Sequence, residues 1–402
     1  MEVIRTIHPI GQGAFYTERF IHSDSGKPFN VVYDCGSGMC KEIANDGKKI
    51  VEKVFAEGDI IDLLFISHFH ADHINGIRTL LDNKVTIKKL VIPYIDEKVR
   101  HTLKLFSMLT EAVDNEVTFI DPYELVEGTE TTITEIVESD INPENDPISI
   151  DDFMDWHQAD SGTKVALREE NKDAWLFIPF CMKFADDKIQ ELQAEFDAIG
   201  ASEDNTDWLQ DYKKIEEVVA LYKEFICKNL NQTSLMMFST PKEKDLNNDL
   251  ICEPFTHPFI YHEMRRHCET CFSDACGNCH THCTHHHFCV CGHIDFAPTP
   301  SCLYTGDITL DKVVISLISK VTNGYKIGSF QVPHHGSKNS WNNDVFSMID
   351  VEVCTSYFLS HGIANKYHHP NKDVIKCFGH LYRRLSCVNE IISTSILQFY
   401  YI

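Results

Sequence analysis

The spacing of hydrophobic and polar positions predicts a chain that alternates between strands and helices. Short apolar runs and period-two alternation are typical of strands, whereas apolar residues three and four positions apart are typical of helices. Such alternation predicts an α/β protein. In chain order, the expected elements are strands at 1–7 and 29–33 separated by turns at 11–13 and 24–28, a helix at 40–56, a strand at 60–66, a helix at 74–81, a strand at 89–94 and a helix at 96–113.

The middle of the chain interrupts this pattern. Residues 138–160 carry eight acidic side chains and no lysine or arginine, which predicts a solvated loop or insertion. Strand character returns at 172–184, and two helical patterns follow, the second over 208–230. We therefore expect an acidic, helical insertion over 138–229 within a single domain of 1–402. Further strands are expected at 235–238, 302–304 and 330–332.

Metal-ligand side chains gather directly after the predicted strand at 60–66. Six residues hold four of them: His68, His70, Asp72 and His73. Neutral imidazole and carboxylate groups are preferred ligands of Zn²⁺ and related ions. Packed this tightly, the four cannot all reach one ion with good geometry. Two adjacent ions are simpler, one held by His68 and His70. The other would take Asp72 and His73. A polar turn with chance histidines is the alternative that this spacing disfavours.

Three later motifs add side chains of the same kind. A Thr-Gly-Asp sequence places the carboxylate of Asp307 at a strand end, where it can bridge two metal ions. A Pro-His-His-Gly-Ser sequence contains His334 and His335, one of which would complete the ligands of the second ion. A late Asn-x-Tyr-x-His-Pro sequence carries His368 and His369. The choice within each histidine pair stays open at this point.

These motifs together resemble a known family. The spacing His-x-His-x-Asp-His is similar to that of the metallo-β-lactamase superfamily. The later motifs, with an Asn-x-x-Ser-Leu sequence before the strand at 235–238, resemble the hydrolase domain of the DNA-internalisation protein ComEC and its soluble relatives. The resemblance covers residues 1–95, 231–240 and 301–375. It implies an αββα metallo-β-lactamase sandwich of the α/β (α+β) class and a two-metal hydrolase.

The resemblance also implies roles around the two ions. Asp34, at the end of the second strand, would orient the ligand loop through hydrogen bonds; an ordinary Asx turn is the alternative. Asn231 and Ser234 stand where the wider superfamily has a separate histidine for the first ion. That ion would then be held by two histidines, the bridging aspartate and water, and held less tightly. In the family, glycine usually stands at the position of His368.

The expected chemistry is hydrolysis by a metal-activated hydroxide. Two ions, Zn²⁺ or Mn²⁺, would lower the pKa of a shared water, and Asp72 or Asp307 would steer the hydroxide. One histidine of the last motif would protonate the leaving oxygen or bind a phosphate. Ser337 and Lys338 also suit phosphate binding, although a solvated loop lysine is the simpler explanation of Lys338.

A second metal-binding region is expected in a Cys/His-rich insertion over 241–300. Cysteines this dense in a chain with no export signal indicate bound metal rather than disulfides. Two structural zinc ions would supply the folding energy of a segment with few apolar residues. Because basic residues are scarce there, a structural or protein-docking role is favoured over nucleic-acid recognition. The expected ligands are Cys268, Cys271, Cys276, Cys279, Cys283, Cys289, Cys291, His280, His282 and His293.

The net charge and the hydropathy of the chain limit the kinds of binding partner that we expect. The chain has 36 basic and 60 acidic residues, a formal charge of −24 that repels duplex DNA and anionic membranes. No apolar run is long enough to cross a bilayer and no signal segment opens the chain, so a cytoplasmic protein is expected.

We therefore expect a soluble phosphodiesterase or nuclease acting on nucleotides or single-stranded nucleic acid. A hydrolase of small esters or amides is the alternative within enzymes. A scaffold or sensor subunit of a multi-protein bacterial system, such as a defence system, is the alternative outside them.

Overall fold

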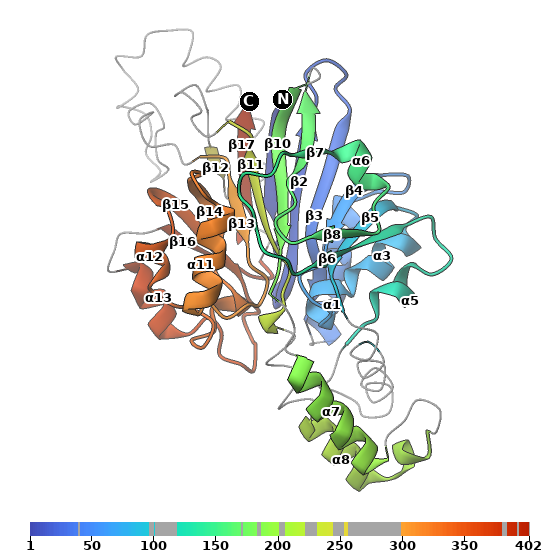
Figure 1. Cartoon of the computed structure of the whole chain (residues 1–402). Coiled ribbons are helices and arrows are strands. Elements are labelled where there is room, and N and C mark those ends of the chain that lie inside the picture. The colour runs from blue at the N-terminus through green and yellow to red at the C-terminus, as the bar shows by residue number, and fades with distance from the viewer. Residues whose placement is uncertain are drawn as a thin grey trace.

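The computed structural model describes residues 1–38, 41–95, 100, 119–169, 172–182, 186–200, 206–221, 231–243, 253–255, 299–379, 384–391 and 394–401. Within these residues the chain forms two large mixed β-sheets flanked by helices (Figure 1). The α/β class expected from the alternation of strands and helices is thereby confirmed. The expected helix at 96–113 lies almost entirely outside the described residues.

The first sheet contains nine strands among the described residues. Its strands β3 to β6 and β8 run parallel to one another, so the carboxyl ends of β3, β4 and β5 lie at one edge. The order across the sheet is β12 (Glu253–Phe255), β17 (Ile396–Tyr401), β1 (Glu2–Ile7), β2 (Gly13–Ile21), β3 (Pro28–Ser37), β4 (Ile60–Phe65), β5 (Thr86–Pro93), β6 (Thr132–Val137) and β8 (Gln158–Asp160).

The second sheet contains eight strands in the described part of the chain. Four consecutive strands, β13 to β16, are parallel, so the loops that follow β13, β14 and β15 leave from one edge. The order is β16 (Arg384–Val388), β15 (Val351–Ser360), β14 (Ile327–Gln331), β13 (Cys302–Tyr304), β11 (Met236–Pro241), β10 (Lys172–Phe180), β9 (Val165–Glu169) and β7 (Ile148–Ser149).

Side chains of both sheets share one hydrophobic core. The rings of Tyr33 on β3 and Tyr304 on β13 stack with centroids 4.8 Å apart. Phe65 on β4 and Phe177 on β10 lie 6.5 Å apart and are fully buried. Because successive strand residues face opposite ways, Leu64 packs instead into a second core on the outer face of the first sheet. Burial on both faces explains why Leu63, Leu64 and Phe65, on opposite faces of β4, are all apolar.

Helices supply the outer sides of these cores. Val51 of α1 and Leu80 of α3 pack into the core that contains Leu64, and Val314 and Ile318 of α11 pack into a third core with strands of the second sheet (Figure 1). The helices are α1 (Lys41–Val54), α2 (Ala71–Ile74), α3 (Gly76–Asp82), α5 (Pro122–Val126), α6 (Ile150–Met154), α7 (Asp186–Ile199), α8 (Tyr212–Leu221), α11 (Lys312–Val321), α12 (Val345–Met348) and α13 (Lys372–Gly379), with 3-10 turns η1 (Thr206–Gln210) and η6 (His334–Gly336).

Two expectations about local structure were wrong. Strand β2 occupies residues between the two turns of the amino-terminal region, where no strand was expected. Residues 138–160 are not simply a solvated loop, because they include β7, α6 and β8, and both Ile150 and Phe153 are buried. Because residues 138–160 are rich in acidic side chains, the few apolar side chains among them that pack between the sheets were not recognised as buried.

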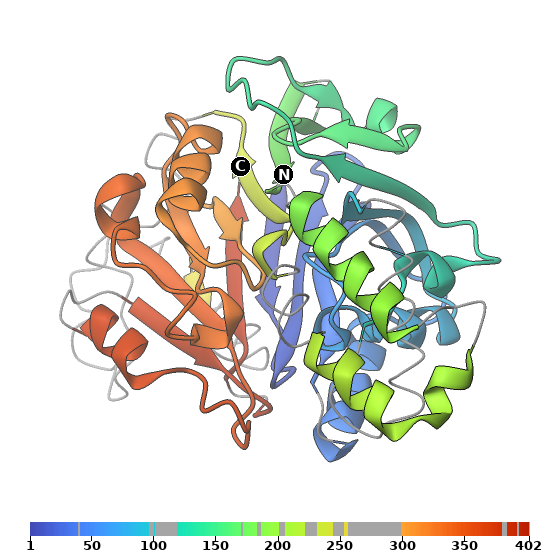
Figure 2. The same cartoon turned by 60° about the horizontal axis from the view of Figure 1, so that its bottom comes forward.

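The expected acidic, helical insertion over 138–229 is divided in the structure. Its first part contributes β8 to the first sheet and β7, β9 and β10 to the second, so it belongs to the framework. Its later part forms α7, η1 and α8, which lie at the lower end of the molecule in Figure 1 and come forward in Figure 2. The second helix of the pair covers a shorter range than expected among the described residues, and 222–230 lies outside them.

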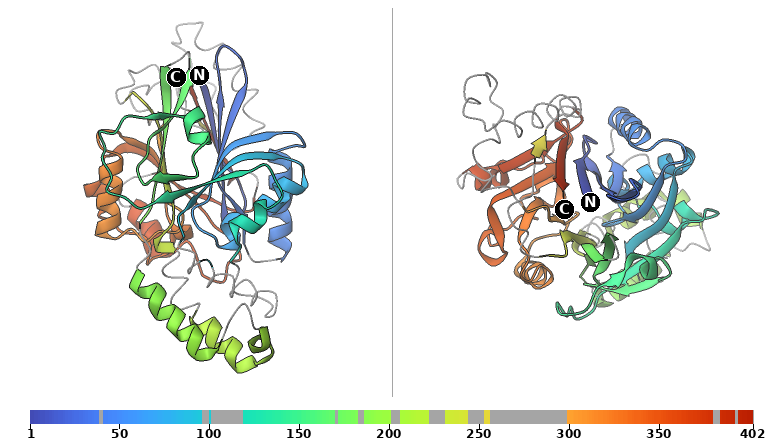
Figure 3. Two further views of the ribbon diagram at one scale, coloured as in Figure 1. Left: turned by 45° about the vertical axis from the view of Figure 1, so that its right-hand side comes forward. Right: turned by 90° about the horizontal axis from the view of Figure 1, so that it is seen from above.

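The two ends of the chain meet in the first sheet. Strand β1 pairs antiparallel with β17, and the termini lie side by side in Figure 3. Within the described ranges, no helix has both the length and the apolar character needed to span a membrane.

Candidate metal centre

The histidines and aspartates singled out in the sequence come from loops at strand ends of both sheets. The loop after β4 carries His68 and His70, and helix α2, which follows it, carries Asp72 and His73. The loop after β13 carries Asp307, and the 3-10 turn η6 after β14 carries His334 and His335. Parallel strands bring their carboxyl ends to one edge, which is where open α/β sheets bind ligands. The two edges meet, because His73 Nε2 lies 3.4 Å from Asp307 Oδ1.

A buried carboxylate holds the loop after β4. Asp34 on β3 accepts hydrogen bonds from Ser67 N (2.6 Å) and Ser67 Oγ (2.7 Å). Its Oδ2 also lies 2.8 Å from His73 Nδ1. With Nδ1 donating to this carboxylate, Nε2 of His73 is the ring atom left to face Asp307. Asp34 thus lies in the position that the sequence analysis assigned to it.

Asp307 lies at the centre of the cluster. Its Oδ2 is 3.9 Å from His68 Nε2, 3.8 Å from His334 Nε2 and 3.9 Å from His335 Nε2, while Asp72 Oδ2 is 3.5 Å from His335 Nε2. His68 Nε2 lies 2.9 Å from His70 Nδ1.

Three compact groups within the described residues could hold a metal ion; one consists of His22, Asp24 and Glu169, and the other two belong to this cluster and share His73. His68, His73 and Asp307 form one, and Asp72, His73 and His335 form the other, with ligand atoms within 4.8 Å of one another in each. The expected division of ligands between the two ions placed His73 only with Asp72. In the structure His73 belongs to both groups, because its Nε2 also lies close to Asp307.

The chemistry of these atoms fits bound divalent ions. His73 Nε2, His335 Nε2 and Asp307 Oδ1 are buried and find no hydrogen-bond partner among the described residues. Buried polar atoms are normally paired, and an unpaired set of ligand atoms aimed at one another indicates a missing partner such as an ion. Imidazole nitrogens with carboxylate oxygens suit Zn²⁺ and Mn²⁺.

Burial and charge set the protonation of the ligands. Burial lowers the pKa of His68, and lowers the pKa of His70 to about 4, so both rings are neutral near pH 7 and have a nitrogen lone pair to offer. For His73 and His335, burial is the largest single effect and acts downward, but the nearby carboxylates together, Asp307 first among them, raise the pKa. Binding an ion at these two rings therefore displaces protons.

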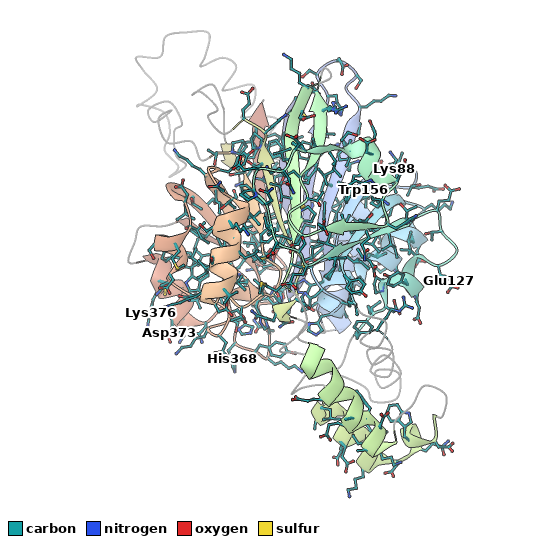
Figure 4. The ribbon with its side chains drawn as sticks, in the orientation of Figure 1. Lys88, Glu127, Trp156, His368, Asp373 and Lys376 are labelled. Atoms are coloured by element: carbon teal, nitrogen blue, oxygen red, sulfur yellow. The ribbon has the colours of Figure 1, made fainter. Side chains whose placement is uncertain are left out.

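The structure brings one histidine of the last motif close to the centre. The ring of His369 is half-buried, with its centroid 5.6 Å from that of His334. The exposed His368 lies at the lower edge of the left-hand part of the molecule in Figure 4, on the side where Asp373 and Lys376 also lie. Partial burial, reinforced by His334 and His335, lowers the pKa of His369 to about 4. His369 is therefore neutral at pH 7 in this structure.

Hydrogen bonds from one asparagine hold the loop that carries His369. Asn365 Nδ2 donates to Gly362 O and to His369 O, each at 2.6 Å, and Asn365 Oδ1 accepts from His369 N at 2.9 Å. Asn371 N donates to Gly336 O (2.9 Å), which ties this loop to the His334–His335 turn.

The other residues that the sequence analysis assigned to the site lie at different distances from its centre. Asn231 Nδ2 lies 3.5 Å from His334 Nδ1, and Ser234 is buried with an Oγ that has no hydrogen-bond partner in the described ranges. Ser337 is buried beside the metal-ligand turn. Lys338 Nζ donates to Asp373 Oδ2 at 3.0 Å, and both side chains are exposed. Lys338 is therefore engaged on the surface, as the simpler explanation held.

Sequence reasoning missed three residues that shape the site. Ser67 connects Asp34 to the ligand loop, Gln331 Oε1 accepts from Thr305 N (2.9 Å) and Gly306 N (3.2 Å), and Ser360 O lies 2.9 Å from His335 Nδ1. Ser67 and Gln331 stand beside recognised motifs, so adjacency was an available signal. Ser360 acts through its backbone, which leaves no trace in residue type.

The expected zinc ligands between Cys268 and His293 lie outside the described residues. No family model matches this chain, and a search of curated proteins also found no match.

Proposed function

We propose that this chain is a two-metal hydrolase of the metallo-β-lactamase type, an αββα sandwich acting on phosphodiesters in nucleotides or single-stranded nucleic acid. The observation that carries the proposal is the convergence of His68, His73 and His335 on Asp307, in which His73 Nε2, His335 Nε2 and Asp307 Oδ1 have no hydrogen-bond partner among the described residues. The two facing sheets and the helices on their outer faces support the sandwich architecture.

Each side chain of the centre has a defined task in this proposal. Asp307 would contribute to both ion sites, His68 and His70 to the first, and Asp72 and His335 to the second. Bound divalent ions would supply Lewis acidity toward water and the substrate's oxygen. Asp34 fixes the ring of His73 through its 2.8 Å contact with Nδ1, which keeps the ligand nitrogen in place before any ion or substrate binds.

His369 and His334 support a phosphodiester as the substrate. His334 is the most exposed ring of the cluster, with 32% of its side chain accessible, and His369 lies beside it. A neutral His369 can donate one N–H to a phosphoryl oxygen, and a substrate's negative charge would favour its protonated form, which can then release a proton to the leaving oxygen. The formal charge of −24 opposes long duplexes, so small or single-stranded substrates fit best.

Hydrolysis assays with loaded protein test the proposal. We expect Zn²⁺- or Mn²⁺-loaded protein to cleave a model phosphodiester, a cyclic nucleotide or a short single strand. His70→Ala should abolish turnover, whereas the matched change at an exposed position, His157→Ala, should leave it intact. Cleavage of a carboxylic ester or lactone in place of all three phosphodiesters would contradict the substrate class. Inactivity on every class would favour a metal-containing scaffold or sensor.

The Cys/His-rich segment over 241–300 is proposed to hold structural zinc and to dock a protein partner. Its composition supports this, because cysteine thiolates and histidine nitrogens are the usual ligands of structural Zn²⁺. Zinc analysis of Asp307→Ala should show this zinc retained while the ions of the centre are lost. Disulfides and no zinc in that segment would contradict the proposal.

A further inference from the structure

The loop between β15 and α13 presents an exposed aromatic ring beside the metal centre. Tyr367 is 49% accessible, whereas Tyr33 and Tyr304 of the shared core are fully buried. Its ring lies nearly parallel to that of His369, at an angle of 16° with centroids 6.0 Å apart. Parallel rings at this distance form an offset stack. The stack covers part of Tyr367 and leaves nearly half of the residue accessible to a ligand.

A row of rings connects Tyr367 to the metal centre. His369 stacks on Tyr367 and lies 5.6 Å from His334, centroid to centroid. His334 Nε2 in turn lies 3.8 Å from Asp307 Oδ2. Two ring-to-ring contacts thus separate Tyr367 from the histidine that faces Asp307, so a group bound on Tyr367 would border the reacting phosphate.

Hydrogen bonds hold Tyr367 in place before any substrate binds. Asn365 Oδ1 accepts from His369 N (2.9 Å) and Asn365 Nδ2 donates to His369 O (2.6 Å), so one side chain closes the segment that contains Tyr367. Further along, Asn371 N donates to Gly336 O (2.9 Å), which anchors the loop to the metal-ligand turn. A ring fixed in this way loses little conformational entropy when a flat group stacks on it.

Positive charge surrounds Tyr367, although the chain as a whole carries −24. Lys366 Nζ lies 5.4 Å from the centre of the Tyr367 ring. Residues 361–379 contain three lysines and one carboxylate, Asp373. Lys376 and Asp373 mark this side of the molecule in Figure 4. This local excess of positive charge suits the phosphates of a nucleic-acid strand.

We propose that Tyr367 is the stacking platform for the nucleobase that borders the cleaved phosphodiester. The inference rests on the proposed function and deepens it, because it makes a base, and not only a phosphate, a requirement of the substrate. Aromatic side chains stack on bases whose faces are open, as they are in a single strand and not within a duplex. Tyr367 therefore favours single strands for a reason that is separate from net charge.

Binding of labelled strands tests the inference without any assay of hydrolysis. Zn²⁺-loaded His70→Ala protein, which should not cut the strand, is titrated into a short deoxyadenosine strand and followed by fluorescence anisotropy. Adding Tyr367→Ala should weaken binding roughly 5–150-fold, the loss of one base–aromatic stack. Adding Tyr367→Phe should retain the affinity, because the phenyl ring also stacks. The matched control, Trp156→Ala, removes an exposed ring (38% accessible) elsewhere on the molecule in Figure 4 and should retain it too.

A strand of the same length without bases separates stacking from damage to the loop. The His70→Ala parent should bind this abasic strand more weakly, and Tyr367→Ala should not weaken that binding further, because no base remains to be stacked. Equal affinity of the parent and Tyr367→Ala for the deoxyadenosine strand would overturn the inference. An equal loss for both strands in Tyr367→Ala would overturn it as well.

The same measurements separate this inference from the proposed function. Strand binding that depends on Tyr367, in a wild-type protein that cleaves no phosphodiester, would refute the proposed hydrolysis alone. Cleavage of strands by the wild type, together with equal binding by the parent and Tyr367→Ala, would overturn the inference alone. A protein that neither binds nor cleaves a strand would overturn both.

Discussion

His73 and Asp34 form a fully buried pair, with His73 Nδ1 2.8 Å from Asp34 Oδ2 and no solvent exposure of either side chain. The residues are far apart in the chain, Asp34 on β3 and His73 on the short helix α2 that follows β4, and they meet because β3 and β4 are parallel neighbours. The pair fixes which nitrogen of His73 faces Asp307, so it links the framework of the first sheet to the metal centre.

Replacing Asp34 should therefore weaken metal binding. Asp34→Asn keeps the shape and tolerates the left-handed backbone (φ 54°), but exchanges one acceptor oxygen for a donor. We expect an affinity for Mn²⁺ or Zn²⁺ about 10–100-fold lower, measured by titration calorimetry. The matched control is Asp62→Asn, a buried carboxylate that instead accepts from Asn30 N and Lys88 Nζ. Equal losses in both variants would show that the effect is general to buried carboxylates.

The two histidines of the last motif should differ sharply in their contribution to turnover. His369→Ala is expected to lower kcat by roughly 10²–10⁴-fold if the ring transfers a proton, because His369 lies beside His334. His368→Asn should change kcat by less than about threefold, since His368 is exposed and asparagine accepts its φ of 56°. Steady-state kinetics on a phosphodiester that the wild type cleaves would check both. A larger loss at His368 would reverse this assignment.

Gly336 should be needed for the contact between the two loops that carry histidines. Its φ is 78°, and an added Cβ would lie 2.7 Å from Pro370 Cβ. Gly128 has a φ of 77° with nothing within 4 Å of an added Cβ, so Gly128→Ala measures the backbone strain alone. Urea unfolding should show a loss of about 1–2 kcal/mol for Gly128→Ala. Gly336→Ala should lose about 1–3 kcal/mol more through overpacking. Equal losses of unfolding free energy in Gly336→Ala and Gly128→Ala would mean that the two loops can move apart to make room for the added Cβ.

His8 should make the fold sensitive to acid. Its Nε2 lies 2.9 Å from Thr17 Oγ1, its ring stacks on Phe15 at 4.4 Å, and burial lowers its pKa to about 3. An unfolded histidine has a pKa of about 6.5 and so takes up a proton first. The contribution of His8 is complete above pH 6.5 and is lost as the pH falls toward 3, by at most about 1.4 kcal/mol per pH unit.

Unfolding free energies measured at pH 7, 6 and 5 would isolate this effect. His8→Leu should flatten the decline between pH 6.5 and pH 5 relative to wild type, whereas a change at the exposed His157 serves as the control. An unchanged slope in His8→Leu would show that His8 stays neutral for another reason or that its ring is accessible to protons in the folded state.

The sequence by itself determined the elements whose pattern is local. The apolar run over 60–66 is buried on both faces of a central strand, and a run of this kind is visible without knowledge of its neighbours. The spacing from His68 to His73 likewise placed four ligand-type side chains after that strand. The short elements within 138–160 were missed because their apolar residues are few. Strand β2 was missed although its sequence contains Phe15, Tyr16 and Phe20, which the structure shows to be buried.

The tertiary structure decided what depends on distant contacts and on backbone conformation. Asp307 and His335 come from the other sheet, and only the meeting of the two strand edges brings them to His73 and Asp72. Which imidazoles face Asp307 followed from the consecutive left-handed φ angles of His334 and His335, which residue type alone does not dictate. The sequence determines which side chains can act as ligands. The direction in which each side chain points is set by the backbone and by neighbours far along the chain, and a ligand atom binds an ion only where its lone pair points.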